Sequence, residues 1–382
     1  MSNQHKLKIL REDELQKRVA VVLGTRPGIV MLSPIIRELE RRNLEYFVVH
    51  TGQHYSPNMD RQFFEDLKLP DPHYKFEHVQ HCQYHGEQTA EMLKGCEQVF
   101  LKEKPKIVLV GGDANTNLAG ALAARKLHIR VGHIEAGERS YDWRMPEEHN
   151  RVLIDHISDF LFTTNEKGRQ NLEKDGVLGQ IFITGNPIVD AAYQNLEIAE
   201  ETSCILENLG LGTHNYFVLT LHREENVDIR ERLEGVLKGL QAVGSQFQIP
   251  IIFPTHPRTF RRLQEFNLLE KAETIKYLRI HKAIGYLDFL KLLAHAQLVF
   301  TDSGGVQQES CILHVPCVTL RDNTEWTETL EIGANTLAGT DPEQIVAGAE
   351  GMLQASRTWH NPFGDGQAAK RIVDVIEKEL RR

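Results

Sequence analysis

The chain has 382 residues, of which 41% are hydrophobic and 25% are charged, and its net charge is −9. This composition excludes fibrous and largely disordered structure, and the length suits two α/β domains better than a single core. The acidic balance argues against a nucleic-acid surface, although a local basic pocket around a phosphate is compatible with it.

The five cysteines are scattered and include no C-x-x-C spacing, which argues against a disulfide framework or a zinc site. The first residues are charged throughout, and no apolar run reaches the ~20 residues of a membrane span. We therefore expect a cytoplasmic protein that binds no metal, no membrane and no nucleic acid.

The first series of elements begins after a polar segment, residues 1–17, which is predicted to be an extension. RVAVVLGT is a short apolar run that opens into a loop, the pattern of a buried parallel strand. Further strand-like runs alternate with helix-like stretches: YFVVHTG, IVLVGGD, IRVGHIEAG, FLFTT and IFITGN. This βαβ alternation predicts a first Rossmann-like domain over residues 18–190.

A second series follows the loose acidic segment NLEIAEETSCILENLGLGTHN. Its strand-like runs are YFVLTLHR, IPIIFPTH, LRIHKA, LVFTDSGG, PCVTL and NTLAG. They predict a second Rossmann-like, nucleotide-binding domain over residues 210–365, with the boundary near 188–214. The charged helix 366–382 is expected to cap this domain or to cross back to the first. The fold class is α/β, with two Rossmann-like domains facing a cleft (GT-B-like).

Candidate functional residues stand directly after the apolar runs, because ligands of parallel sheets bind outside the carboxyl ends of the strands. Arg26 and His222 follow the first strand of each domain and are candidates for clamping a diphosphate from both sides. Both residues also fit ordinary loops.

The segment SGGVQQES offers a phosphate site, because a Ser-Gly-Gly loop that opens a helix exposes backbone N–H groups. The residues concerned are Ser303, Gly304 and Gly305. Glu309, further along the helix, is placed to accept the two hydroxyls of a ribose. A tight turn with glycine chosen for backbone conformation alone fits this segment equally well.

Three carboxylates are the acid–base candidates, namely Asp113, Glu135 and Glu147. Glu147 begins a helix, where a simple capping role is also expected. Because carboxylates that converge near a diphosphate repel one another, at least one of them should have a raised pKa. Arg151 and Asp155, spaced i,i+4 on the following helix, are interpreted as a surface ion pair.

An ordered series of motifs resembles that of the non-hydrolysing UDP-N-acetylglucosamine 2-epimerases from about residue 19 to residue 338. The motifs are GTRPG, TGQHY, GGDANT, HIEAGERSYDWRMPEEHNR, ITGNPIVDA, TLHREEN, TDSGGVQQES and VTLRDNTEW. The resemblance implies a GT-B-like enzyme, usually a homodimer, that uses neither metal nor redox cofactor on its UDP-sugar substrate. A base would remove the C2 proton, UDP would leave by anti elimination, and UDP would add back to 2-acetamidoglucal with the proton on the opposite face. The expected product is UDP-N-acetylmannosamine for cell-surface polysaccharide.

The resemblance also implies roles for residues at matching positions. The catalytic set would be Asp113, Glu135, Glu147 and the phosphate-contacting His222, and the nucleotide contacts would be Arg26, Phe289 near the uracil, Ser303, Gly304, Gly305 and Glu309. Gln53 and His54 match a segment that binds a second UDP-sugar as activator, but YSPNM follows them instead of the usual continuation. We therefore expect weak or absent activation.

Three positions depart from the family pattern. Gly28, Met31 and Trp326 stand where many members have glutamate, lysine and arginine, which removes two positive charges beside the diphosphate. The sequence TEW, which contains Trp326, is also found in relatives that epimerise UDP-diacetamido-uronic acids. A uronic-acid epimerase, a GT-B glycosyltransferase, a non-catalytic nucleotide-sugar-binding relative and hydrolytic release of N-acetylmannosamine therefore stay open. The three carboxylates favour an epimerase over a transferase, which needs at most one base.

Overall fold

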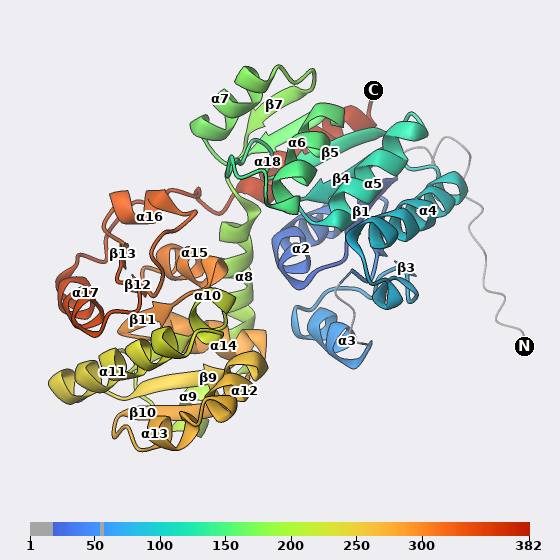
Figure 1. The fold of residues 1–382 in the computed structure, drawn as a ribbon. Helices are drawn as coiled ribbons and strands as arrows, with labels where there is room; N and C mark the ends of the chain where they lie inside the picture. Colours follow the sequence, from blue (N-terminus) through green and yellow to red (C-terminus); the bar gives the residue numbers. More distant parts are fainter. Residues whose placement is uncertain (1–17, 54–56) are drawn as a thin grey trace, which may run out of the picture. The chain divides into compact units, whose positions relative to one another are not determined.

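The structure is a computed structural model that describes residues 18–53 and 57–382, so the predicted extension 1–17 lies outside the described residues. The chain divides into two compact units (Figure 1). Unit 1 comprises the described residues up to Ala191 together with Phe363–Arg382, and unit 2 comprises Ala192–Pro362. Each unit is a parallel sheet covered by helices, which confirms the predicted fold class of two Rossmann-like α/β domains.

Unit 1 is built on a parallel sheet with strand order β3-β2-β1-β4-β5-β6-β7 in the described residues. Its strands are β1 Val19–Leu23, β2 Tyr46–His50, β3 Tyr74–Lys75, β4 Ile107–Gly111, β5 Arg130–Ile134, β6 Phe160–Thr163 and β7 Gln180–Ile183. All residues of β1 and β4 are buried, as expected for central strands with helices on both faces. The strand order reverses between β1 and β4, where open α/β sheets bind their ligands.

The helices of unit 1 follow the strands in turn. They are α2 Arg26–Arg41, α3 Pro57–Asp66, the 3-10 helix η1 Val79–His81, α4 His85–Glu103, α5 Asn115–Lys126, α6 Pro146–Ile157, α7 Glu166–Asp175 and the C-terminal α18 Ala368–Leu380. Helix α8, Pro187–Thr202, carries the chain from unit 1 into unit 2. Helix α18 packs against α2, so the end of the chain belongs to unit 1.

Unit 2 repeats this plan with strand order β10-β9-β8-β11-β12-β13. Its strands are β8 Phe217–Thr220, β9 Ile251–Thr255, β10 Leu278–Lys282, β11 Leu298–Thr301, β12 Cys317–Thr319 and β13 Asn335–Leu337. Its helices are α9 Ile205–Leu209, α10 Glu224–Val227, α11 Arg230–Phe247, α12 Pro257–Glu265, α13 Leu269–Glu273, α14 Tyr286–Ala294, α15 Gly304–Ile312, α16 Thr327–Glu331 and α17 Pro342–Gln354. The order reverses between β8 and β11.

Every strand-like run predicted from the sequence forms a strand, whereas β3 was not predicted. Strand β3 has two residues, too few to show a periodic pattern, and it forms by pairing with the end of β2. In the described part of the chain, no helix is both long enough and apolar enough to cross a membrane.

Candidate functional site

Asp113 and Glu135 come together at the carboxyl edge of the unit 1 sheet. Asp113 follows β4 through Gly112, and Glu135 follows β5 directly, and these strands are parallel neighbours. A Cβ atom added to Gly112 would lie 3.4 Å from Oε2 of Glu135, so the two loops are in close approach. This edge lies beside the β1–β4 switch point, as expected for a ligand site.

Glu135 is held in a form that resists ionisation. Burial raises its pKa to about 8, and the neighbouring Glu138 and Asp113 carboxylates act in the same direction. Asn186 Nδ2 donates a hydrogen bond to Glu135 Oε1 at 2.8 Å. Glu135 also has φ of 68°, a left-handed conformation that is uncommon outside glycine and concentrates at functional sites. The prediction that one carboxylate has a raised pKa is thus confirmed for Glu135.

Asp113 has the opposite environment, because Arg151 of α6 forms an ion pair with it. Arg151 also contacts Glu148 Oε2 at 3.1 Å, and only 15% of its side chain is exposed. The interpretation of Arg151 and Asp155 as a surface ion pair is therefore wrong. Helix α6 turns both side chains inward. Arg151 reaches Asp113, and Asp155 is fully buried against His133.

Glu147 and Glu148 begin helix α6 but differ in their surroundings. Glu147 lies partly exposed in the first turn. Glu148, which the sequence did not single out, is buried and accepts hydrogen bonds at 2.9 Å from Ser140 N, Ser140 Oγ and Tyr141 N. Burial opposes the ionisation of Glu148, yet these hydrogen bonds keep its pKa below the usual range. Glu148 thereby anchors the loop that joins Glu135 to Glu147.

Gln53 lies in the loop after β2, and its side chain reaches the first turn of helix α5, which begins two residues after Asp113. Its Oε1 atom accepts hydrogen bonds at 2.8 Å from both N and Oγ1 of Thr116. Because Ala114 occupies the N-cap position and its methyl group cannot accept a hydrogen bond, Gln53 supplies the missing cap. The other predicted regulatory residue, His54, lies outside the described residues.

Arg26 is the first residue of helix α2 at the carboxyl end of β1, and its guanidinium lies 6.0 Å from the centre of the Phe63 ring. Thr25 caps this helix by accepting a hydrogen bond from Gly28 N at 3.2 Å. The Met31 sulfur would lie 3.2 Å from a Cβ atom at Gly111, so Met31 packs against the loop before Asp113. An apolar side chain thus fills the position where many family members carry lysine.

In unit 2, His222 follows β8 and is oriented by Asp302, which follows β11 across the switch point. Asp302 is fully buried and accepts hydrogen bonds from His222 N at 3.0 Å and from Arg223 N at 2.9 Å. The His222 Nδ1 atom lies 3.3 Å from Asp302 Oδ1, and 37% of the His222 side chain is exposed. The sequence reasoning missed Asp302, although its place directly after β11 was a usable signal.

Ser303, Gly304 and Gly305 form the start of helix α15 at the same edge. Ser303 is the N-cap, and its Oγ accepts a hydrogen bond from Val306 N at 3.5 Å. A Cβ atom at Gly304 would lie 2.2 Å from Oε1 of Glu325, whereas one at Gly305 would meet no described atom within 4 Å. An alanine at Gly304 would therefore displace the Glu325 carboxylate. The helix N-terminus presents N–H groups suited to a phosphate.

Glu309 lies within helix α15, where Tyr286 Oη donates a hydrogen bond to its Oε1 atom at 3.0 Å. Burial raises the pKa of Glu309 to about 7. Phe289 lies on α14, the helix that begins at Tyr286, and packs partly buried against the core of unit 2. The Tyr286 hydrogen bond thus connects α14, which carries Phe289, to Glu309 on α15.

Trp326 stands beside a small cluster of charges in unit 2. Arg321, with 11% of its side chain exposed, pairs with Glu325 at 2.7 Å and with Glu225 at 3.0 Å. Arg223 approaches Glu325 at 3.8 Å. Two guanidinium groups thus lie near the position where Trp326 replaces the arginine of many relatives, and Glu225 and Glu325 balance their charge.

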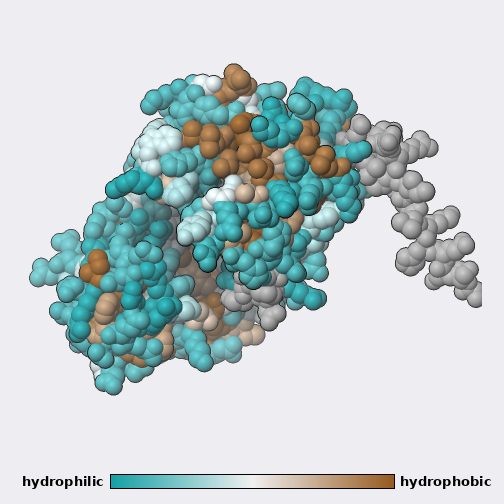
Figure 2. Space-filling model, turned by 45° about the vertical axis from the view of Figure 1, so that its right-hand side comes forward, coloured by the Kyte–Doolittle hydropathy of each residue, from teal (hydrophilic) through white to brown (hydrophobic). Residues whose placement is uncertain are grey.

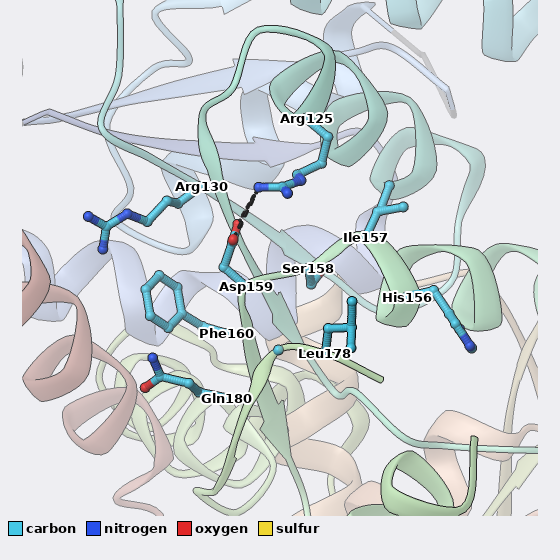
Figure 3. A pocket seen from close by; sticks show the side chains of 10 residues that line it. Arg125, Arg130, His156, Ile157, Ser158, Asp159, Phe160, Leu178 and Gln180 are labelled. Carbon is cyan, nitrogen blue, oxygen red and sulfur yellow. Dashed lines mark hydrogen bonds and ion pairs between the residues drawn. The ribbon is translucent and has the colours of Figure 1, made fainter. Parts of the chain in front are cut away.

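A pocket of about 320 Å³ in unit 1 lies at the other, amino end of the sheet (Figure 3). Arg130, Phe160 and Gln180, the first residues of β5, β6 and β7, line it. Arg125 and Asp159 form an ion pair there at 2.9 Å. The pocket includes none of the predicted site residues, so it is distinct from the candidate site.

Comparison with known proteins agrees with this arrangement. The family model described as UDP-N-acetylglucosamine 2-epimerase matches residues 37–377. The chain belongs to the UDP-N-acetylglucosamine 2-epimerase family. It is 51% identical over 362 residues to the UDP-N-acetylglucosamine 2-epimerase of Methanocaldococcus jannaschii, covering 94% of this chain and 98% of that protein.

Two further relatives bear on the ligand. The crystal structure of the Methanocaldococcus jannaschii UDP-GlcNAc 2-epimerase in complex with UDP-GlcNAc and UDP matches with a TM-score of 0.82 and 50% identity, covering 94% of this chain and 99% of that one. The UDP-2,3-diacetamido-2,3-dideoxy-D-glucuronate 2-epimerase of Pseudomonas aeruginosa is 39% identical over 368 residues, covering 94% of this chain and 99% of that protein. Family membership is thus established.

Proposed function

We propose that the protein epimerises UDP-N-acetylglucosamine at C2 to UDP-N-acetylmannosamine, without hydrolysing it. The observation that carries this proposal is the close approach of Glu135, whose pKa burial raises to about 8, to Asp113, which forms an ion pair with Arg151. Epimerisation requires one group that accepts a proton and another that delivers one to the opposite face. Two neighbouring carboxyl groups with opposed environments meet that requirement.

The carboxyl groups of unit 1 divide the proton transfers in this proposal. Asp113, as a carboxylate, takes the C2 proton while the C1–O bond to UDP breaks, which leaves 2-acetamidoglucal. Glu135, as a neutral acid, delivers a proton to C2 on the opposite face while UDP adds back at C1. Glu147, in the first turn of α6, is the third acid–base group, and exchange with solvent restores the starting protonation states.

Unit 2 holds the departing UDP in this proposal. His222 and the N-terminus of α15, with Ser303, Gly304 and Gly305, stabilise the charge that develops on the diphosphate. Glu309 accepts the ribose hydroxyls, Phe289 lies near the uracil, and Arg26 is the cationic phosphate contact from unit 1. The mechanism calls on no metal or redox cofactor.

The assay that tests the proposal is proton NMR of UDP-N-acetylglucosamine with the purified protein in deuterated water, without added metal or cofactor. We expect the manno anomeric signal to appear with deuterium at C2. UDP-2,3-diacetamido-2,3-dideoxy-glucuronate serves as the competing substrate, because the Pseudomonas relative carries that name. Faster turnover of the uronic acid, or no turnover of either sugar by folded protein, would overturn the substrate assignment.

We also propose that the protein works as a cytoplasmic homodimer. All five cysteines are free thiols, which fits a reducing compartment. Figure 2 shows apolar side chains gathered on one face of unit 1, and Leu101 of α4 and Leu153 of α6 are 58% and 52% exposed. A second copy covering these helices would bury them. Light scattering should give twice the 43.6 kDa chain mass, and a monomer in both the wild type and Leu153→Lys would refute it.

A further inference from the structure

His133 is a buried polar residue that the reaction outlined above does not use. It lies in β5, two residues before Glu135, and its side chain has no exposed surface. Both of its ring nitrogens have partners, and such pairing matters because an unpaired buried polar group is destabilising. Its partners therefore show what the residue does.

The two ring nitrogens of His133 bond to two different elements. Nδ1 lies 2.7 Å from Oδ1 of Asp155 on α6, and Nε2 lies 3.1 Å from the carbonyl oxygen of Gly112. A backbone carbonyl oxygen only accepts hydrogen bonds, so Nε2 donates its hydrogen to Gly112 while Nδ1 faces the Asp155 carboxyl group. Gly112 immediately precedes Asp113, and the imidazole thus fixes the loop that presents this carboxylate.

Asp155 fixes the second loop. Its Oδ2 atom accepts a hydrogen bond from Gly137 N at 3.2 Å and pairs with Arg139 at 2.7 Å. Burial opposes ionisation of Asp155, but His133 and Arg139 outweigh it and hold its pKa below the usual range. The Arg139 side chain, 2% exposed, also contacts Asp175 at 2.9 Å, so two carboxylates share this guanidinium. Gly137 lies two residues after Glu135, within the loop that presents it.

We infer that His133 and Asp155 are positioning residues that lock the Asp113 and Glu135 loops together, so that proton removal and proton return at C2 occur in one fixed geometry. The inference rests on the proposed epimerase function. Proton transfer depends steeply on the distance between reacting atoms, so loops that slip apart slow chemistry more than they weaken nucleotide binding. The nucleotide contacts proposed in unit 2 are not part of this network.

His133→Gln tests the inference, because glutamine can keep one of the two hydrogen bonds. We expect kcat to fall roughly 10- to 100-fold while KM changes less than about threefold. We also expect free UDP and 2-acetamidoglucal to be released more often per epimerisation, a ratio that does not depend on the fraction of active protein. Asp155→Asn should raise the same ratio through the Gly137 side of the network. His156→Gln is the matched control, since His156 follows Asp155 on helix α6 and its side chain is exposed.

NMR of 15N-histidine-labelled protein supplies a readout that is independent of turnover. The Nε2 atom of His133, assigned by the signal lost in His133→Gln, should show an attached hydrogen, because it donates to the Gly112 carbonyl. A His133→Gln variant that binds UDP stoichiometrically and keeps the wild-type kcat and release ratio would overturn the inference, as would an Nε2 atom without an attached hydrogen. A wild-type protein that epimerises no UDP-sugar would instead overturn the proposed function on which the inference rests.

Discussion

In both units the candidate residues lie at the carboxyl edge of a parallel sheet, but their carboxyl groups have different surroundings. In unit 1, burial raises the pKa of Glu135 to about 8, and the neighbouring Asp113 carboxylate acts in the same direction. In unit 2, the fully buried Asp302 accepts backbone N–H groups and so orders the His222 loop. The first arrangement suits proton transfer, and the second suits holding an anion in place. The difference indicates that chemistry and nucleotide binding can be disabled separately.

The largest expected effect is on turnover when Asp113 loses its charge. Asp113→Asn removes the proton acceptor while preserving side-chain volume, so kcat should fall by about 10³-fold or more. UDP affinity, measured by titration calorimetry, should change less than about threefold. Turnover at the wild-type rate would contradict the role of Asp113. A parallel loss of UDP affinity would contradict the conclusion that chemistry and nucleotide binding can be disabled separately.

The converse variant is Asp302→Asn in unit 2. An amide offers one acceptor where the carboxylate offers two, so the His222 loop loses its alignment and UDP affinity should fall about 10- to 100-fold. Asp322→Asn is the control, because 70% of the Asp322 side chain is exposed. Calorimetry on folded Asp302→Asn that gave wild-type affinity would refute this role of Asp302.

A third expectation concerns pH. If Glu135 acts as a neutral acid with pKa about 8, kcat/KM should decline as the pH rises through about 8, because the acid form is lost. A pH profile measured between pH 6 and 10, at roughly constant ionic strength, checks this point. A profile that stayed flat through pH 9 would rule Glu135 out as the acid.

The stability of Glu135→Gln should move in the opposite direction from its activity. The folded state raises the pKa of Glu135 from an ordinary 4.5 to about 8, so this carboxyl progressively destabilises the fold as pH rises from about 4.5 to about 8. Glutamine cannot ionise and still accepts from Asn186. The free energy of unfolding of the Glu135→Gln variant should therefore exceed that of the wild type by roughly 1–3 kcal/mol at pH 8 and by little at pH 5. Urea denaturation at the two pH values measures the difference.

The smallest expected effect is a difference in stability between alanine substitutions at two adjacent glycines of unit 2. Gly304→Ala would displace Glu325 from its ion pairs and should lower stability by about 1 kcal/mol. Gly305→Ala meets no described atom within 4 Å and should be neutral or slightly stabilising, because alanine favours a helix. Thermal unfolding of both variants compares them, and equal melting temperatures would contradict the packing described for Gly304.

The sequence could predict the elements whose signals are local. Apolar runs identified the buried strands, and strand-end positions brought out Asp113 and Glu135, because neighbouring parallel strands end at one edge. Strand β3 could not be predicted, since two residues show no period. The Arg151–Asp155 interpretation failed because i,i+4 spacing places two residues on one helix face without saying whether that face meets solvent or the sheet.

Side chains that act by positioning other groups leave the weakest signal in the sequence. Glu148 and Asp302 look like ordinary helix-start and loop residues in the sequence, and their roles depend on backbone N–H groups that only the folded loops bring near. His133 is similarly hidden within a strand. Its importance follows from contacts with Gly112 and Asp155, which lie 21 and 22 residues away along the chain.

The most direct test follows deuterium at C2 of UDP-N-acetylglucosamine in deuterated water, comparing the wild type, Asp113→Asn and Asp302→Asn at saturating substrate. The account predicts deuterium in the manno product of the wild type, none with Asp113→Asn despite bound UDP, and exchange that persists with Asp302→Asn once its weaker binding is saturated. Product formed by the wild type without deuterium at C2, or exchange that continued in Asp113→Asn, would contradict it.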